Sequence, residues 1–545
     1  MRRLSLTIIV VFALASHAAA DVLWRDNDDL PIPEPEKEED EGMTWWNDAR
    51  SLSFYQVGKV ADLGNVVRAV GQTIRLVGPR EAANVNALEE VPDSTWFTNR
   101  HARKRLTGEE LIAGAPGAAP STSGPLTVVS GKGGEAPGFT VEDEKGDRYL
   151  VKFDPQNLSE MATGAELVSS RIVHACGWNV PAYHLLTVSP DRLALASDAE
   201  IEDEYHRKRP MKRADVEKAL SQAARRPDGR YRASASLLLP GTPKGPFLVE
   251  GMRPDDPNDT IPHEDRRDLR GFRVVAAWIH HTDFRPENTL DVFLAERGRK
   301  NVGHLVHYLL DFSSTLGSAD LEPKPPKFGH EYSIDPPIIA ANFATLGVWV
   351  KRWEDLEIVH PALGYFSSRA FDPEDWVTDF PNAVFDRATP RDEYWGAKLV
   401  ASFSDEDIRA LVGAGEWSDP RAAELLSQTL IARRREIARA FLDSRSVNPA
   451  DRFAVDERGL VFEDLAVTAG IVDRRRARYR HRLSDERWVI SDGTVIPRQR
   501  LGGGVTIELE ASHDGLRSWS PTTEVEVARG AAGELEVVRI ERATR

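Results

Sequence analysis

Two short polar motifs near the middle of the chain constrain its fold more than any other feature. The first is residues 280–290, HHTDFRPENTL, in which Asp283 and Asn288 stand five positions apart. The second is residues 308–313, YLLDFS, in which Asp311 follows an apolar run. Two carboxylates and an amide in this order suit a site that accepts a hydroxyl proton and holds Mg²⁺ beside phosphates. We therefore expect the fold to bring the two motifs together.

The preceding region is typical of an antiparallel sheet with a glycine-rich loop. Strand-like runs at 126–130, 139–143 and 148–153 are separated by the loop 131–138, GKGGEAPG, and by a tight turn. Glycines in such a loop let backbone N–H groups approach phosphates, because no Cβ stands in the way. The loop lacks the G-x-x-x-x-G-K-[ST] pattern of a P-loop. Taken alone, it also fits an ordinary hairpin.

A lysine and a glutamate follow on adjacent predicted elements. Lys152 lies on the third strand, and Glu166 lies on a helix predicted over 160–176 with Gly177 at its C-terminus. A strand lysine and a helix glutamate can meet across the interface, where the lysine would contact phosphates. The alternative is that both are surface charges. Further along, 247–252 is predicted as a strand and hinge, and a helix from Pro262 leads into the first motif.

These motifs resemble those of two groups of kinases. Residues 281–288, HTDFRPEN, are similar to the catalytic loop H-R-D-L-K-P-x-N of eukaryotic-type protein kinases, and 310–313, LDFS, to their metal-binding D-F-G. The upstream segments 133–137, GGEAP, and 149–153, YLVKF, with Glu166, are more similar to the atypical HipA-type Ser/Thr kinases. The resemblance spans about a third of the chain, 126–317, as motifs in order rather than as continuous sequence.

The resemblance implies an α+β fold with two lobes, a β-rich N-lobe and an α-rich C-lobe, that binds ATP with Mg²⁺. It implies that Asp283 accepts or orients the proton of a hydroxyl acceptor, in a protein or a small molecule. Arg285 would steady the transferred phosphoryl group. Asn288 and Asp311 would hold Mg²⁺, for which carboxylate and amide oxygens are suitable hard ligands.

The resemblance also assigns residues to the nucleotide. Lys152 would clamp the phosphates, and Glu166 would fix Lys152. Gly133 and Gly134 would cover the phosphates. The segment around Glu250 would meet the adenine through its backbone. Each of these roles is an expectation that follows from the resemblance.

The chain departs from the kinase pattern in ways that leave other functions open. Ser313 replaces the glycine of D-F-G, Thr282 replaces the arginine after the histidine, and no A-P-E follows. These departures bear on regulation and on the recognition of a protein substrate more than on nucleotide binding. A catalytically silent pseudokinase that acts as a binding module is one alternative. The reason is that the N-terminus predicts export, as described below, and ATP is scarce outside the cytoplasm.

A second alternative is a metal-dependent hydrolase. Four histidines surround the two aspartates, and His and Asp side chains together can hold Zn²⁺ or a two-metal hydrolytic centre. They are His280, His281, His304 and His307. The spacing of the last two is poor for one strand face, since residues three apart on a strand point to opposite sides.

The N-terminus predicts export. Residues 1–20 combine Arg2 and Arg3, an apolar run and an A-x-A site, which is typical of a signal peptide cleaved after Ala20, so we expect a secreted or periplasmic protein. No later run is long and apolar enough to predict an integral membrane segment. The single cysteine, Cys176, cannot form an intrachain disulfide. A net charge of -16 argues against nucleic acid as a partner.

Composition also predicts the domain boundaries. Residues 21–44 are an acidic, Pro-rich linker, and 45–120 are an N-terminal extension with a helix near 60–70. The N-lobe covers 121–260, with a charged, exposed insertion at 198–232, and the C-lobe covers 261–447, where Arg433 is expected on the wet side of a helix. Residues 448–545 alternate with period two, which predicts a small β-rich domain in which the basic run 474–482 is solvated.

Overall fold

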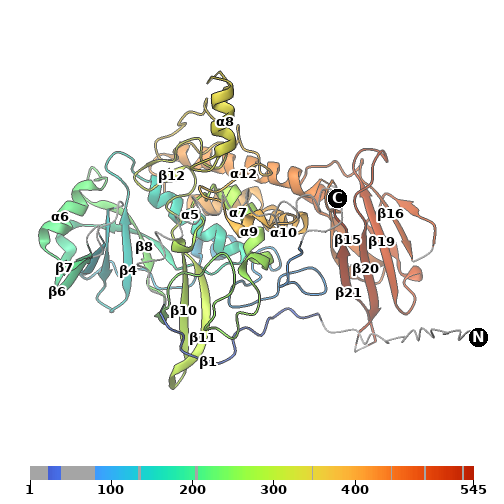
Figure 1. The fold of residues 1–545 in the computed structure, drawn as a ribbon, viewed down its shortest axis with the longest axis horizontal. Helices are drawn as coiled ribbons and strands as arrows, with labels where there is room; N and C mark the ends of the chain where they lie inside the picture. The colour runs from blue at the N-terminus through green and yellow to red at the C-terminus, as the bar shows by residue number, and fades with distance from the viewer. Residues whose placement is uncertain are drawn as a thin grey trace, which may run out of the picture.

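The computed structural model describes residues 22–37, 80–132, 137–202, 207–346, 348–443, 445–483, 486–530 and 533–545, and these form a mixed α+β protein with several sheets. Along the longest axis a seven-stranded sheet lies at one end, helices fill the centre and two further sheets lie at the other end (Figure 1). The predicted signal peptide, the helix near 60–70, and Gly133 and Gly134 lie outside the described residues.

The seven-stranded sheet has the order β5-β8-β4-β3-β2-β6-β7 and is antiparallel except for the pair β2 and β6. Its strands are β2 (Leu126–Lys132), β3 (Gly138–Glu142), β4 (Arg148–Phe153), β5 (Tyr183–Val188), β6 (Leu193–Glu202), β7 (Lys208–Pro210) and β8 (Tyr231–Leu237). On β4 the residues Tyr149, Val151 and Phe153 are buried in alternation. Lys152 therefore projects from the opposite face.

Helix α5 (Met161–Cys176) packs against this sheet on the side that Lys152 faces. The helix predicted over 160–176 is therefore confirmed. Nearly all of its residues are buried. Gly177 ends it with φ 137°, and a Cβ there would lie 2.2 Å from the ring of Phe97. Only glycine fits this position without displacing the ring.

The charged insertion at 198–232 is more ordered than predicted. It contains the end of β6, all of β7, and α6 (Arg213–Gln222), which buries Val216 and Leu220 against the sheet. The prediction of a wholly exposed insertion is therefore wrong. The apolar stripe of α6 is narrow and is easily missed among the many charged residues of this segment. Two buried positions four residues apart are nevertheless enough to dock a short helix.

A second sheet carries the chain between the two motifs. Its order is β1-β11-β10-β9, with β1 (Ile32–Pro33), β9 (Thr242–Pro243), β10 (Thr289–Glu296) and β11 (Arg299–Leu309). Ile32 is buried in it, so this part of the expected 21–44 linker is a paired edge strand. The strand predicted at 247–252 is wrong, because this segment runs from β9 to α7 without strand pairing.

The helical centre holds the largest core. Its principal helices are α7 (Arg267–Ile279), α10 (Pro390–Ala401), α11 (Asp405–Gly413) and α12 (Pro420–Leu442), with the shorter α4 (Gly108–Ala113) and α9 (Ala383–Asp386) beside them. Helix α7 is the helix predicted from Pro262, but it begins only at Arg267, after a separate 3-10 turn at His263–Asp265. Arg433 is not on the wet side of α12. It is 3% exposed, donates to the carbonyl of Ala277 at 2.9 Å and lies over the ring of Phe371.

The C-terminal residues form two antiparallel sheets. The first has the order β14-β15-β18, and the second β17-β16-β19-β20-β21. The strands are β14 (Ala450–Val455), β15 (Gly459–Asp464), β16 (Arg478–Leu483), β17 (Val489–Ser491), β18 (Val495–Pro497), β19 (Val505–Ser512), β20 (Thr523–Arg529) and β21 (Leu535–Arg542), with the short α13 (Leu465–Thr468) after β15. The basic run is only partly solvated, because Arg480 and Arg482 pair with Glu510 and Glu508.

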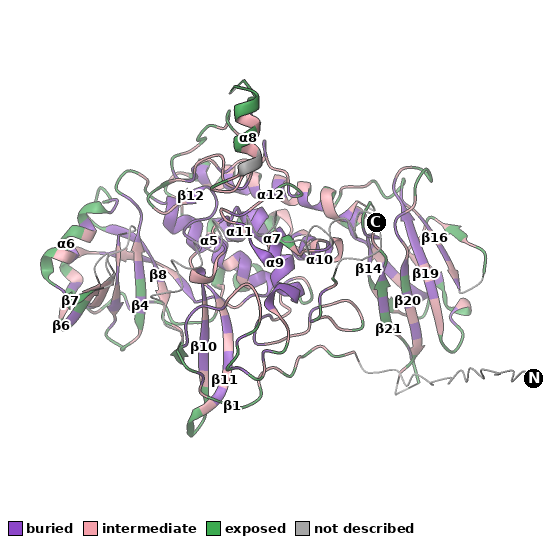
Figure 2. Ribbon diagram, viewed as in Figure 1, coloured by how far each residue is buried: buried purple, intermediate pink, exposed green. Residues whose placement is uncertain are grey.

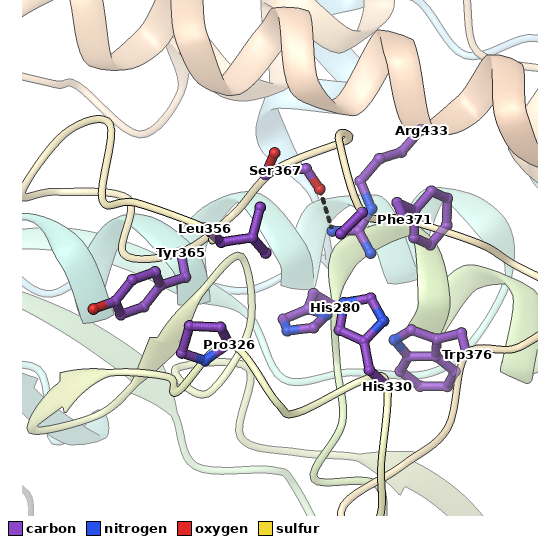
Figure 3. A pocket seen from close by; sticks show the side chains of 10 residues that line it. His280, Pro326, His330, Leu356, Tyr365, Ser367, Phe371, Trp376 and Arg433 are labelled. Carbon is purple, nitrogen blue, oxygen red and sulfur yellow. Dashed lines mark hydrogen bonds between the residues drawn. The ribbon is translucent and has the colours of Figure 1, made fainter. Parts of the chain in front are cut away.

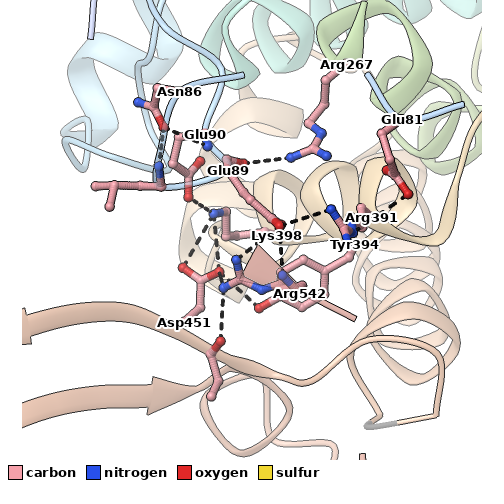
Figure 4. Close-up of polar contacts among 12 residues, drawn as sticks. Glu81, Asn86, Glu89, Glu90, Arg267, Arg391, Tyr394, Lys398, Asp451 and Arg542 are labelled. Carbon is pink, nitrogen blue, oxygen red and sulfur yellow. Dashed lines mark hydrogen bonds and ion pairs between the residues drawn. The ribbon is translucent and has the colours of Figure 1, made fainter. Parts of the chain in front are cut away.

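A buried ionic cluster joins these C-terminal sheets to the helical centre (Figure 4). Asp451 on β14 lies 2.8 Å from Arg542 on β21 and 3.4 Å from Lys398 on α10. Lys398 also pairs with Glu90, which precedes the described helices. Burial alone would raise the pKa of Asp451, but the two cations hold it at about 2.

No helix among the described residues is long and apolar enough to cross a membrane. Helix α8 (Pro336–Ala344) stands away from the helical centre (Figures 1 and 2). A two-stranded ribbon of β12 (Ser318–Ala319) and β13 (Glu322–Pro323) lies between it and the second motif in the chain.

The ionic cluster predicts how firmly the C-terminal sheets are held. We expect Asp451→Asn to leave Lys398 and Arg542 undercompensated, because it removes the buried charge between them. The free energy of opening β14 and β21 should fall by about 3–5 kcal/mol. Native-state hydrogen exchange of these strands measures this change.

The matched control is Glu463→Gln, whose ion pair with Arg452 is more than two-fifths exposed on both sides. It should change the same quantity by less than about 1 kcal/mol. Equal effects of the two substitutions would show that the buried cluster does not hold the joint.

Candidate functional site

Strand β4 and helix α5 bring Lys152 and Glu166 together, as predicted. The Nζ atom of Lys152 lies 3.5 Å from Oε1 of Glu166. Ser234 on β8 donates a short hydrogen bond to the other carboxylate oxygen of Glu166. Glu166 is buried between the sheet and the helix, and the Lys152 side chain is only 20% exposed, so neither charge is displayed on the surface. The alternative that they are surface charges is therefore wrong.

Asp311 completes the group from a different part of the chain. It follows β11 by two residues, and its Oδ1 accepts a hydrogen bond from Lys152 Nζ at 2.7 Å and one from Ser313 Oγ at 2.5 Å. Its backbone has φ 52°, a left-handed conformation that is unfavourable for a residue other than glycine. Such strain persists where the surroundings fix it, and it is concentrated at functional sites.

The three charges differ in how firmly they are ionised. Burial lowers the pKa of Lys152, but Asp311 and Glu166 outweigh it and hold that pKa well above its usual value. Burial raises the pKa of Glu166 to about 7. Burial also opposes ionisation of Asp311, but Lys152 and Ser313 bring its pKa down to about 2. At neutral pH the principal ion pair therefore joins Lys152 to Asp311.

The first motif forms a second polar group. Helix α7 ends at Ile279, and the chain turns at His280, which has φ 58°. A single turn, Pro286–Asn288, then places Asn288 against Asp283, whose Oδ2 accepts from Asn288 Nδ2 at 2.9 Å. Arg285 lies 2.9 Å from the other carboxylate oxygen of Asp283. Burial raises the pKa of Asp283 to about 6, against the opposing charge of Arg285.

The backbone brings the two groups side by side. The N–H of Leu310 donates to the carbonyl of Asn288 at 2.8 Å, so the residue before Asp311 pairs with the residue that holds Asp283. The amide nitrogen of Asn288 is engaged with Asp283, which leaves its oxygen as the group available to a cation. Hard oxygens of Asn288 and Asp311 on adjacent backbone segments fit the chemistry of Mg²⁺.

Two charged residues of this region were missed by the sequence reasoning. Asp320 has φ 59°, and its pKa is raised by burial and by the nearby charge of Asp311. Lys324 is buried, and its Nζ donates to Thr282 Oγ1 at 2.7 Å and to the carbonyl of Ser314 at 3.0 Å. Neither belongs to a recognised motif. Both follow Asp311 in a stretch with few apolar residues, so periodicity gave no signal.

The remaining predicted residues are less closely tied to these groups. Glu250 lies in the extended segment before α7, next to Gly251, whose N–H donates to Glu264. Its contact with adenine stays a prediction. His307, one of the alternative zinc ligands, bonds to Asp291 at 2.6 Å and stacks on Trp96. Within the described ranges, no three His, Cys, Asp or Glu side chains are grouped to hold a metal ion.

Two small cavities flank the groups. One adjoins Lys152, Glu166, Ser234 and Asp320, and its volume of about 10 Å³ has room for about one water molecule. The other, of about the same volume, lies at the far end of the first motif and is lined by His280, among other residues (Figure 3). Lys152 Nζ and Asp311 Oδ1 are in direct contact at 2.7 Å beside the first of these cavities.

The raised pKa of Asp283 predicts a pH-dependent stability. The folded chain holds a proton that the unfolded chain releases near pH 3.8, so this stabilisation is present at low pH and is lost as pH rises through about 6. We expect the unfolding free energy of the wild type, relative to Asp283→Asn, to fall by about 2 kcal/mol from about pH 4.5 to about pH 7.5.

Urea titrations of both proteins at the two pH values measure this difference. The control is Asp375→Asn, because the Asp375 side chain is 77% exposed and should give a pH dependence parallel to the wild type. If the Asp283→Asn curve is also parallel to the wild type, the pKa of Asp283 is not raised.

Comparison of the chain with protein-family models, with curated proteins and with solved structures finds no match in any of the three. The feature that indicates a function is therefore the geometry of five residues, Lys152, Glu166, Asp311, Asp283 and Asn288. These residues come from β4, α5, the turn after β11 and the turn after α7, and they meet at the face of the seven-stranded sheet that adjoins the helical centre.

Proposed function

We propose that the chain is a kinase-like protein that binds ATP with Mg²⁺ and transfers a phosphoryl group to a hydroxyl acceptor. The observation that carries the proposal is the ion pair of Lys152 with Asp311, with Glu166 at 3.5 Å behind it. Five residues expected from the motif order meet in one place although up to 159 positions separate them. Chance motif matches would be scattered over the fold.

In this proposal Asp283 acts on the acceptor hydroxyl. A carboxyl whose pKa is about 6 is mostly ionised at neutral pH and still basic enough to share the proton of an alcohol in the transition state. The hydroxyl oxygen forms a bond to the γ-phosphorus as the bond from that phosphorus to the β-γ bridging oxygen breaks. ADP leaves, and the hydroxyl proton passes to Asp283. Asn288 and Arg285 hold the Asp283 carboxylate in place.

Lys152 would bind the phosphates of the nucleotide. Its ammonium now bonds to Asp311, and a triphosphate with Mg²⁺ offers both partners an alternative, because phosphate oxygens attract the ammonium and Mg²⁺ attracts the carboxylate. When bound, Mg²⁺ neutralises charge on the phosphates, and Asp311 and Asn288 are the residues that would hold it. Glu166, which accepts a hydrogen bond from Ser234, would hold the Lys152 ammonium in position beside the phosphates.

The proposal extends to the fold and to the location of the protein. The seven-stranded sheet with α5 would be the β-rich N-lobe (121–260), and the helical centre would be the C-lobe (261–447), with the nucleotide between them. The signal-like residues 1–20 support a secreted or periplasmic protein that would meet its nucleotide outside the cytoplasm. The C-terminal sheets would hold the C-lobe through the Asp451 cluster.

One observation favours a second candidate, a binding module without phosphotransfer. Ser313 stands where the resembled motif has glycine, and its hydroxyl bonds to the same Asp311 oxygen as Lys152. A chain locked in this closed arrangement would bind nucleotide weakly or hold it without reaction. Binding and transfer experiments distinguish the two candidates.

Nucleotide binding predicts a thermal shift. We expect ATP with Mg²⁺ at about 100 times its Kd to stabilise the mature chain by about 2.7 kcal/mol, seen as a rise of several degrees in Tm. Asp311→Asn should lose the part of the shift that depends on Mg²⁺. The control Asp355→Asn, whose side chain is 68% exposed, should keep it. No shift in any condition contradicts both candidates.

Phosphotransfer predicts a separate loss. With γ-labelled ATP and a mixture of hydroxyl acceptors, including Ser/Thr peptides and the chain itself, we expect Asp283→Asn to lower labelling by about 10²–10⁴-fold. Its ATP-induced thermal shift should persist, because Asp283 is not assigned to nucleotide binding. Equal labelling by Asp283→Asn and wild type rejects Asp283 as the base. Nucleotide binding without labelling by the wild type identifies the binding module.

A further inference from the structure

Exposed large apolar side chains are concentrated in the segment that contains α8. Residues 334–350, which we name the α8 protrusion, hold seven of the 19 large apolar side chains that are exposed in the described ranges. Phe343, Leu346 and Val348 are 77%, 89% and 79% exposed. A concentration of apolar surface of this kind marks an interaction site.

The apolar character of α8 extends around the whole helix. Its sequence, PPIIAANFA, has Asn342 as the only polar side chain, so no face is left for water. A helix that packs into a protein groove presents apolar anchors along one stripe and polar residues elsewhere. A helix that is apolar on every side is instead surrounded by an apolar medium, in a protein core or in lipid.

The shape of the protrusion suits lipid. It stands away from the molecule (Figure 2), and Ile339 and Phe343 of α8 are exposed. Nine helical residues span about 13 Å, less than half of the hydrocarbon core of about 30 Å, so the helix is long enough to enter one leaflet only. Trp349 lies at its foot and is 43% exposed, and indole rings favour the boundary between lipid and water.

Charge indicates the kind of lipid surface. Residues 331–375 contain eight Asp and Glu but three Lys and Arg, so the base of the protrusion carries a formal charge of 3 − 8 = −5. Lys351 and Arg352 at the foot are paired with acidic neighbours, Glu331 and Asp372 among them. An anionic surface would repel this base, whereas zwitterionic headgroups would not.

The protrusion is also connected to the site. Ser333, just before α8, donates its N–H to the carbonyl of Asp379, and Asp379 donates its N–H to the carbonyl of Thr282 at 2.8 Å. Thr282 precedes Asp283. A surface bound by the protrusion would therefore be coupled through two backbone hydrogen bonds to the turn that holds Asp283.

We propose that the α8 protrusion inserts into the interfacial layer of a zwitterionic lipid bilayer and holds the protein at that surface. This function is independent of phosphotransfer. It requires no spanning helix, because the protrusion enters one leaflet only.

Flotation with phosphatidylcholine vesicles tests the proposal on the mature chain. We expect the wild type to float with the vesicles and the double variant Phe343→Ser, Leu346→Ser to bind at least about tenfold more weakly, since both side chains lose their transfer into lipid. Both residues are exposed, so the variant should keep the Tm of the wild type. The control is Ile490→Ser, because Ile490 is an apolar residue on β17 that is 56% exposed and lies outside the protrusion, and it should bind as the wild type does.

A site-specific probe gives a second readout. Cys176 is the only cysteine and is buried, so Phe343→Cys can be labelled selectively with an environment-sensitive dye. We expect a blue shift of its emission when phosphatidylcholine vesicles are added.

Four outcomes overturn the proposal. The first is a wild type that is not recovered with vesicles at all, and the second is a double variant that binds as strongly as the wild type. Binding that requires phosphatidylserine and is lost in salt would indicate an anionic surface. A dimer in light scattering that the double variant abolishes, without vesicle binding, would identify a second copy of the chain as the occupant.

Discussion

The ion pair between Lys152 and Asp311 is the interaction on which the organisation of the site depends. It joins a strand of the seven-stranded sheet to the turn that follows β11, and its two atoms, Lys152 Nζ and Asp311 Oδ1, lie 2.7 Å apart. Each partner is costly to bury alone, because a single charge in a poorly solvated interface loses its hydration without compensation. The pair therefore fixes how the sheet and the helical centre face each other.

Strained backbone supports this arrangement. His280, Asp311 and Asp320 all have left-handed backbone conformations, and each lies at a turn beside the polar groups. Their conformations are held by the core below them, where Trp278, Ile279 and Phe312 are fully buried. The rigid core thus stabilises turns that would be unfavourable in an isolated peptide. The strained backbone conformations therefore occur at the turns that position the polar side chains of the site.

The second constraint is the buried cluster around Asp451. It brings together Glu90, which precedes α4, Lys398 on α10, and two residues of the C-terminal sheets. These two are Asp451 on the first strand, β14, and Arg542 on the last strand, β21. Its partners are distant in sequence, so these charges tie the C-terminal sheets to the helical centre. Apolar packing joins the two parts as well, because Leu465 and Ala466 of α13 belong to the same hydrophobic cluster as the helical centre.

Local sequence patterns were sufficient to predict the helices and strands whose side chains repeat with a clear period. Helices α5 and α7, strands β4 and β5, and the β-rich end were predictable because burial of one face imposes that period on the residues. The identities of Lys152, Glu166, Asp283, Asn288 and Asp311 were predictable from the motifs. Only the tertiary structure decided that Arg433 is buried, that 247–252 is not a strand, and that Asp320 and Lys324 join the site. These outcomes depend on contacts between distant segments, and local periodicity does not encode such contacts.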